Sequence, residues 1–193
     1  HDEAVATATL IAPLQKRLEE PWRIGWHSYT VGAAIGAVSY PAIARTPGDV
    51  ESRAQLARTA MATGRTDMGE ELYRTARKNA AGNQRLARAV AWNHGWDLYR
   101  ADEPARALEQ WAGLIGGWPS APSWQPPTLA LALWKLGRRQ EAVAWYAAAV
   151  RTEPGQWSDA SRFAELLPDW REEERATLAE VLAAWQEKPP AWP

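Results

Sequence analysis

One pattern that occurs twice at a fixed offset constrains this chain more than any other feature of its sequence. The pattern is a small residue, an aromatic residue and a proline, seen first as Ala107, Trp111 and Pro119 and then, thirty-five residues later, as Ala142, Tyr146 and Pro154. A small residue followed by an aromatic one helical turn later, with a proline that ends the helix, describes the second helix of a packed pair. The spacing therefore predicts a repeated pair of antiparallel helices.

Each copy also has a small residue in the preceding helix, Gly95 in the first and Ala130 in the second. With these residues the segment from Arg88 to Pro154 resembles the tetratricopeptide repeat, which has a small residue in its first helix, A-x3-F/Y in its second and a closing proline, on a period of about 34. The resemblance extends more weakly over residues 49–186. It implies an all-α fold, a right-handed superhelical stack of antiparallel helix pairs.

A weaker copy precedes the two clear ones. The small and apolar residues expected to face the inside of its two helices are Leu56, Ala57, Ala60, Gly69, Tyr73 and Ala76. The first of these helices is predicted to end at Gly64. Because Tyr73 lies thirty-eight residues before Trp111, a short insertion is expected over residues 80–84.

A further helix pair is predicted after Pro154, from Ser158 to Leu167 and from Asp169 to Gln186. In its second helix the small-residue places fall on Ala176 and Ala183, and Glu180 stands where the repeat has an aromatic residue. A polar residue there suits a terminal helix that faces water instead of another repeat.

The chain is predicted to have three parts. These are an N-terminal helical segment over residues 1–48 that is interpreted as a degenerate repeat, a repeat domain over residues 49–186 and a proline-rich tail over residues 187–193. Within the first part, helices are expected at Glu3–Glu20 and Ser28–Arg45, joined by an irregular connection that carries Trp22 and Trp26. The apolar run in the second of these helices is too short to cross a bilayer, so no membrane span is expected.

Charge and composition exclude several classes of function. The net charge of −1 and the pI near 6.4 provide no basic surface for a phosphate backbone, so nucleic acid is not expected as a partner. There are no cysteines, and the three histidines share no ligand spacing, so neither a metal nor another cofactor is predicted. Carboxylates cluster at Glu70–Glu71 and at 169–174, where first turns of helices are expected and negative charge complements the helix dipole. No catalytic residue is assigned.

The aromatic residues point to a binding surface. Trp111 and Tyr146 hold the packing place of the repeat and are predicted to be core, whereas Trp92, Trp96 and Tyr99 follow one another at i, i+4 and i+7 on the opposite side of their helix from Gly95. In tetratricopeptide proteins the first helices of successive pairs line a concave surface that binds an extended peptide or a partner helix. Carried over by position, the predicted binding residues are Trp92, Asn93, Trp96, Tyr99, Arg100, Thr128, Leu131, Trp134 and Lys135.

The resemblance thus implies a non-enzymatic interaction module, an adaptor or assembly factor that binds a protein or peptide in a concave aromatic groove. An aromatic-lined site for a saccharide or another small molecule, with or without hydrolysis, is the alternative, because stacked tryptophans also suit sugars. A second alternative concerns the groove itself, which the N-terminal segment could fill. The compartment stays open between the cytoplasm and, if His1 marks a processed end, the periplasm or the exterior.

Overall fold

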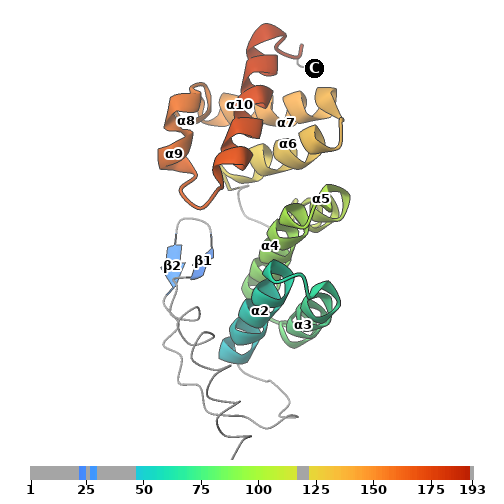
Figure 1. Ribbon diagram of the computed structural model, residues 1–193. Helices are drawn as coiled ribbons and strands as arrows, with labels where there is room; N and C mark the ends of the chain where they lie inside the picture. The colour runs from blue at the N-terminus through green and yellow to red at the C-terminus, as the bar shows by residue number, and fades with distance from the viewer. Residues whose placement is uncertain (1–21, 25–26, 30–46, 117–121, 192–193) are drawn as a thin grey trace, which may run out of the picture.

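The computed structural model describes residues 22–24, 27–29, 47–116 and 122–191 (Figure 1). In this part of the chain nine α-helices pack largely as sequential antiparallel pairs. Three pairs come first: α2 (Pro47–Ala62) with α3 (Thr66–Asn79), α4 (Gln84–Arg100) with α5 (Pro104–Ala112), and α6 (Gln125–Lys135) with α7 (Arg139–Thr152). The all-α prediction is confirmed for the described repeat region.

Local sequence explains where these helices begin. Asn83 precedes α4, and its side-chain oxygen accepts a hydrogen bond from the Leu86 N–H at 3.1 Å. Pro104 opens α5, at a position where a missing N–H costs nothing. The first turn of α10 (Glu172–Glu187) carries three glutamates, and the side chain of Glu174 accepts a hydrogen bond from the Arg171 N–H at 2.7 Å.

The turns inside the three pairs repeat one geometry. Gly64, Asp102 and Gly137 each adopt a positive φ, of 75°, 63° and 73°. After each of them the next N–H donates to the carbonyl five residues earlier, always at 2.9 Å: Arg65 to Ala60, Glu103 to Leu98 and Arg138 to Leu133. These turns lie thirty-eight and thirty-five residues apart, the same offsets that separate the repeat aromatics. The predicted register of the three pairs is therefore confirmed by their turns.

The repeat aromatics Tyr73, Trp111 and Tyr146 are fully buried, as predicted. Each ring also places its polar atom on a partner. The Tyr73 hydroxyl donates to Asp97 Oδ2 at 2.5 Å, Trp111 Nε1 donates to the Trp92 carbonyl at 3.1 Å, and the Tyr146 hydroxyl donates to the Trp157 carbonyl at 2.6 Å. These three rings thus fill the space between the helices of each pair, and their own polar groups are hydrogen-bonded.

The inner face of the weaker copy was predicted correctly except at one residue. Ala57, Ala60, Gly69, Tyr73 and Ala76 are buried. Leu56 is 40% exposed, so its assignment to the inner face is wrong. The reason is rotational: Val50, Ala54, Ala57 and Met61 supply the buried stripe of α2 at helical spacing, and Leu56 lies outside that stripe.

The segment after Pro154 departs from the predicted fourth pair. Ser158–Leu167 is not one helix, because the chain instead forms α8 (Pro154–Trp157), the 3-10 turn η1 (Ala160–Arg162) and α9 (Phe163–Leu166). The last helix, α10, packs on both α6 and α7. Its buried residues are Glu174, Leu178, Val181 and Leu182, whereas Ala176 and Ala183 are exposed.

The small-residue places assigned to α10 are therefore wrong. A small residue is needed where two helices of one pair approach closely, whereas α10 lies across a pair and fills its gap with larger side chains. Glu180 is exposed, as expected of a terminal helix that faces water. In Figure 1, α10 stands over α6 and α7 in the C-terminal half of the molecule.

A small β-hairpin replaces part of the predicted N-terminal connection. Strands β1 (Trp22–Ile24) and β2 (His27–Tyr29) pair antiparallel, with Trp22 opposite Tyr29. The predicted irregular connection is therefore wrong over Trp22–Ile24 and His27, and the predicted helix start at Ser28 is also wrong, because Ser28 and Tyr29 belong to β2. Alternating large residues favour a strand pair here. The helix at Glu3–Glu20, residues 30–45, Trp26 and Pro119 lie outside the described residues. Among the helices that are described, none is long and apolar enough to cross a membrane.

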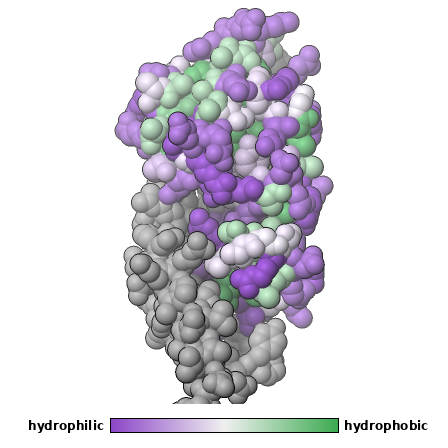
Figure 2. Space-filling view, viewed as in Figure 1, coloured by the Kyte–Doolittle hydropathy of each residue, from purple (hydrophilic) through white to green (hydrophobic). Residues whose placement is uncertain are grey.

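The described part of the face in Figure 2 is mostly hydrophilic, with apolar residues in small separate groups. The large apolar side chains that are exposed are Leu56, Met68 and Ile115, which come from three different parts of the chain. Scattered residues of this kind are normal on a protein surface.

Candidate functional site

A layer of stacked rings joins the second helix pair to the C-terminal part of the chain. We call it the aromatic layer; it consists of Trp92, Trp96, Tyr99, Trp111, Trp124 and Trp170. Trp96 lies at its centre, with ring centroids 5.0 Å from Trp111 and 4.9 Å from Trp170, both edge to face. The Trp92 ring lies 3.9 Å from that of Trp124. Edge-to-face and tilted packing of this kind is typical of a protein core.

The aromatic layer changes the interpretation of the predicted groove. Trp92, Trp96 and Tyr99 were expected to present one open face, but each is more than nine-tenths buried. Trp124, before α6, and Trp170, before α10, pack on these rings. The indole faces of Trp92 and Trp96 are therefore occupied by the protein's own side chains, and they do not form an open ledge for a ligand.

The predicted residues of α6 are also engaged in the fold. Thr128 and Leu131 are fully buried, and the Thr128 hydroxyl donates to the Trp124 carbonyl at 2.8 Å. Trp134 is half-buried, with its Nε1 donating to Glu180 Oε2 at 2.9 Å and the Arg139 guanidinium 3.7 Å from its ring centroid. Asn93 of α4 is likewise half-buried. These positions contribute packing and surface contacts within the chain.

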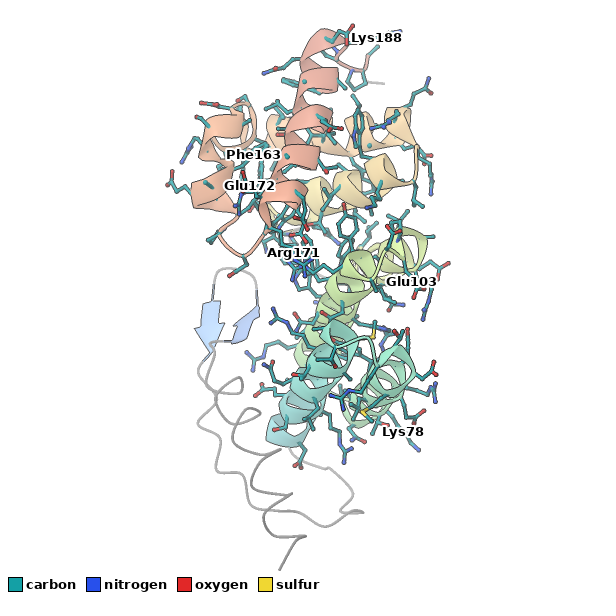
Figure 3. All side chains as sticks on the ribbon, in the orientation of Figure 1. Lys78, Glu103, Phe163, Arg171, Glu172 and Lys188 are labelled. Carbon is teal, nitrogen blue, oxygen red and sulfur yellow. The ribbon has the colours of Figure 1, made fainter. Side chains whose placement is uncertain are left out.

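Three of the predicted residues meet at one pocket. Tyr99 and Arg100, at the end of α4, and Lys135, at the end of α6, line a hollow of about 210 Å³ beside the start of α10. We call it the junction pocket; its other lining residues are Asp102, Arg171, Glu173, Glu174 and Thr177. Figure 3 shows Arg171 at the start of α10, on the side that faces α4.

Glu174 fixes the inner wall of the junction pocket. Its carboxylate accepts two hydrogen bonds from the Arg100 guanidinium, from Nε at 2.8 Å and from Nη2 at 3.0 Å. Arg100 Nη2 also donates to the Asp169 carbonyl at 3.2 Å. Glu174 is only 2% exposed and the side chain of Arg100 is 18% exposed. This bidentate pair therefore joins α4 to α10 where little solvent reaches it.

The rim of the pocket carries two exposed ion pairs. Lys135 Nζ lies 3.2 Å from Asp102 Oδ1 and 6.0 Å from the centroid of the Tyr99 ring. Arg171 Nη1 lies 3.5 Å from Glu173 Oε1. Both pairs are reached by water, and exposed pairs of this kind contribute at most about 1 kcal/mol. They can therefore open at little cost.

Tyr99 forms part of the lining of the same pocket. The residue is 7% exposed, and the Lys135 ammonium lies 6.0 Å from the centroid of its ring. Burial raises the pKa of Tyr99 to about 12, with further contributions from the carboxylates of Glu174, Asp102 and Glu173. The phenol is therefore neutral at ordinary pH.

A second polar cluster is buried between α3, α4 and α5, around His94. The Tyr73 ring stacks on the imidazole with centroids 4.3 Å apart. Arg77 Nη2 lies 2.8 Å from His94 Nδ1, and because a guanidinium can only donate, Nδ1 is the acceptor and the proton is on Nε2, 3.3 Å from Glu70 Oε2. Burial and the Arg77 charge lower the pKa of His94 to about 4, although Glu70 opposes the shift.

Neither cluster is arranged to hold a metal ion. Within the described residues no three histidine, cysteine or acidic side chains are placed to hold a metal ion. The pocket carboxylates Asp102, Glu173 and Glu174 each pair with a lysine or arginine. Comparisons with protein-family models, with curated proteins and with solved structures found no match.

Sequence reasoning missed most of the pocket. Asp102, Arg171, Glu173, Glu174 and Thr177 complete it, and four of these belong to a segment some seventy residues after Arg100. The acidic cluster at 169–174 was assigned to a first helical turn, which is correct for Glu172–Glu174, but the contact with Arg100 has no sequence signal. Asp102 does have a sequence signal, because it occupies a turn position at which the other two helix pairs have glycine.

Proposed function

We propose that this chain is a non-enzymatic interaction module that binds a segment of a partner protein at the junction pocket. In this proposal the helix pairs continue the tetratricopeptide-like arrangement as a right-handed superhelix, and the ends of α4 and α6 line the pocket that receives the partner. The observation that carries it is the meeting of Tyr99, Arg100 and Lys135, all predicted to bind a partner, in one hollow closed by α10.

The physical character of the pocket supports binding by a protein segment. A volume of about 210 Å³ is below the range of about 300–1,000 Å³ that small-molecule sites occupy, so one side chain of a partner is a suitable occupant. Part of its wall is rigid, because the Arg100–Glu174 pair is buried, and its rim pairs are exposed and exchangeable. A preformed wall lowers the entropic cost of ordering a ligand.

The alternative of a saccharide site has weaker support. Sugars stack on open aromatic faces, but the rings of Trp92 and Trp96 pack against Trp124, Trp170 and Trp111. Tyr99 is the one aromatic residue among those that line the junction pocket. We therefore do not propose glycan binding or hydrolysis.

Site-specific photo-crosslinking tests the proposed function. A benzoylphenylalanine in place of Glu173, an exposed rim residue, is expected to crosslink a partner protein in an extract of the source cells. The same group in place of Glu71, an exposed residue of α3 that does not line the pocket, serves as the matched control. The proposal predicts a discrete adduct at 173 that is absent at 71. Equal labelling at both positions, or none at 173, contradicts it.

A further inference from the structure

The junction pocket already holds a cation beside its buried tyrosine. The Lys135 ammonium lies between the Asp102 carboxylate, at 3.2 Å, and the Tyr99 ring, at 6.0 Å from the centroid. This is an arrangement of one carboxylate and one aromatic ring that attracts ammonium and guanidinium groups. Because Lys135 comes from the protein itself, its ammonium marks a position that another cation could take.

The two partners of this ion pair differ in how easily they can leave it. Lys135 reaches the pocket on four methylene groups and is 47% exposed, so it can swing into solvent. Asp102 has a single methylene and is attached to a turn whose backbone is held by the hydrogen bond from Glu103 N–H to the Leu98 carbonyl. An incoming ligand therefore displaces Lys135 more readily than Asp102. The Asp102 carboxylate then needs a new cationic partner.

The charges around the pocket also favour a cationic ligand. Its lining is neutral overall, with three basic and three acidic residues, but Arg100 and Glu174 neutralise each other in their buried pair. Burial raises the pKa of Tyr99 most, and the carboxylates of Glu174, Asp102 and Glu173 add to that rise. The free N–H groups at the start of α10 would favour an anion, but the first turn of that helix carries three glutamates.

The position of Asp102 gives a further reason to assign it a role. It adopts φ 63°, a conformation that favours glycine, and the matching turns have Gly64 and Gly137. An aspartate there is less favourable for the backbone than glycine, yet it places a carboxylate at the mouth of the pocket.

From these observations we infer that the junction pocket receives a basic side chain, a lysine or arginine of the partner segment, whose charge replaces Lys135 on Asp102 and meets the Tyr99 ring. This inference rests on the proposed function, and it specifies the chemistry of the partner. A lysine side chain is an appropriate size for a pocket of about 210 Å³.

Titration of the full chain with short peptides tests the inference. The probes are capped tripeptides with glycine on either side of lysine, norleucine or glutamate, and the readout is the NMR shift of the Asp102 and Thr177 backbone amides. The lysine peptide is expected to shift both amides, and the norleucine peptide, which has the same length without the charge, is expected to leave them in place. Stronger shifts with the glutamate peptide overturn the inference.

Two variants make the test sharper. Lys135→Met removes the competing ammonium and is expected to tighten lysine-peptide binding by about two- to fivefold, the value of an exposed ion pair. Asp102→Asn, which suits the same backbone conformation, is expected to weaken that binding by a similar factor. Glu141→Gln, an exposed carboxylate outside the pocket, is the control and leaves affinity unchanged. If Lys135→Met weakens binding of the lysine peptide, the inference is wrong.

The outcomes separate this inference from the proposed function. If the glutamate peptide binds at the same amides, the pocket is still an interaction site and only the basic class is wrong. If no peptide shifts these amides, the basic class is also wrong, and crosslinking at position 173 decides the interaction function independently.

Discussion

Among single residues, the contact between Gly95 of α4 and Trp111 of α5 shows why the repeat requires a small side chain. A Cβ atom added to Gly95 would lie 2.7 Å from both Cδ1 and Cε2 of the Trp111 indole, closer than such atoms approach. The ring is fully buried and donates to the Trp92 carbonyl, so it cannot move aside. The two helices of this pair can therefore approach this closely only because Gly95 has no side chain.

Gly95→Ala is therefore expected to destabilise the chain by about 1–3 kcal/mol, although alanine alone favours a helix by about 1 kcal/mol over glycine. Urea denaturation measures the effect. Gly155→Ala is the matched control, because a Cβ at Gly155 meets no atom within 4 Å, and it should be neutral or slightly stabilising. A Gly95→Ala midpoint as high as that of the control would show that the helix register described above is incorrect.

The buried imidazole of His94 makes stability depend on pH. The charged and polar groups around it are Glu70 and Arg77 from α3 and Gln110 and Arg106 from α5, with the Tyr73 ring stacked on one face. Because its pKa falls from 6.5 to about 4 on folding, the unfolded chain binds this proton more readily. The stability that this residue contributes is therefore present above pH 6.5 and is lost as the pH falls toward 4.

The full loss amounts to about 3 kcal/mol. It is measured as the free energy of urea unfolding between pH 7 and pH 4.5, compared with His94→Gln, in which the other two histidines still titrate. The slope in this range should be steeper for the wild type than for the variant. Parallel curves would mean that His94 is protonated in the folded chain.

At the scale of elements, α10 connects two parts of the molecule. One side of the helix packs on α6 and α7 through Leu178, Val181 and Leu182. Its first turn is bound to α4 by the two hydrogen bonds between Arg100 and Glu174, and the preceding Trp170 packs on Trp96. The helix therefore sets how the second and third pairs lie relative to each other.

Glu174→Gln should weaken this connection. The amide keeps the size of the side chain but removes the charge from a buried pair, and a hydrogen bond to a charged group contributes about 1.5–3 kcal/mol. We expect a loss of that order in urea unfolding, with faster hydrogen exchange in α10. Glu180→Gln, in the same helix but exposed, should lose less than about 1 kcal/mol. Equal losses would mean that the Arg100–Glu174 pair does not hold α10.

The sequence predicted elements whose packing is local and failed where packing is distant. The pairs from α2 to α7 follow from small residues, aromatics and turns that recur within one unit, as Gly95 and Trp111 do. The register of α10 does not follow from the sequence, because that helix packs across a pair and the repeat pattern assigns no residues to such a contact. The same limit applied to the pocket: Tyr99, Arg100 and Lys135, named from their positions in the repeat, line it, whereas the residues that α10 contributes to its wall have no sequence signal.

In the whole molecule, the aromatic layer and the junction pocket are separate regions. Trp92, Trp96 and Tyr99, which were predicted to line an open groove, are buried. The ring of Trp96 contacts those of Trp111 and Trp170. Loss of such a ring leaves a large cavity and costs about 3–5 kcal/mol. Asp102, by contrast, is exposed and contributes only a weak ion pair to stability.

The central claim is that recognition takes place at the junction pocket, and that the aromatic layer supports the fold. The most direct measurement compares the melting temperature with the affinity for the protein crosslinked at position 173, for Trp96→Ala and Asp102→Asn side by side. Trp96→Ala is expected to melt far below the wild type. Asp102→Asn is expected to keep the wild-type melting temperature and to bind the partner about two- to fivefold more weakly, a loss of up to about 1 kcal/mol. A stable Trp96→Ala chain that has lost the partner, or an Asp102→Asn chain that still binds it fully, would contradict the claim.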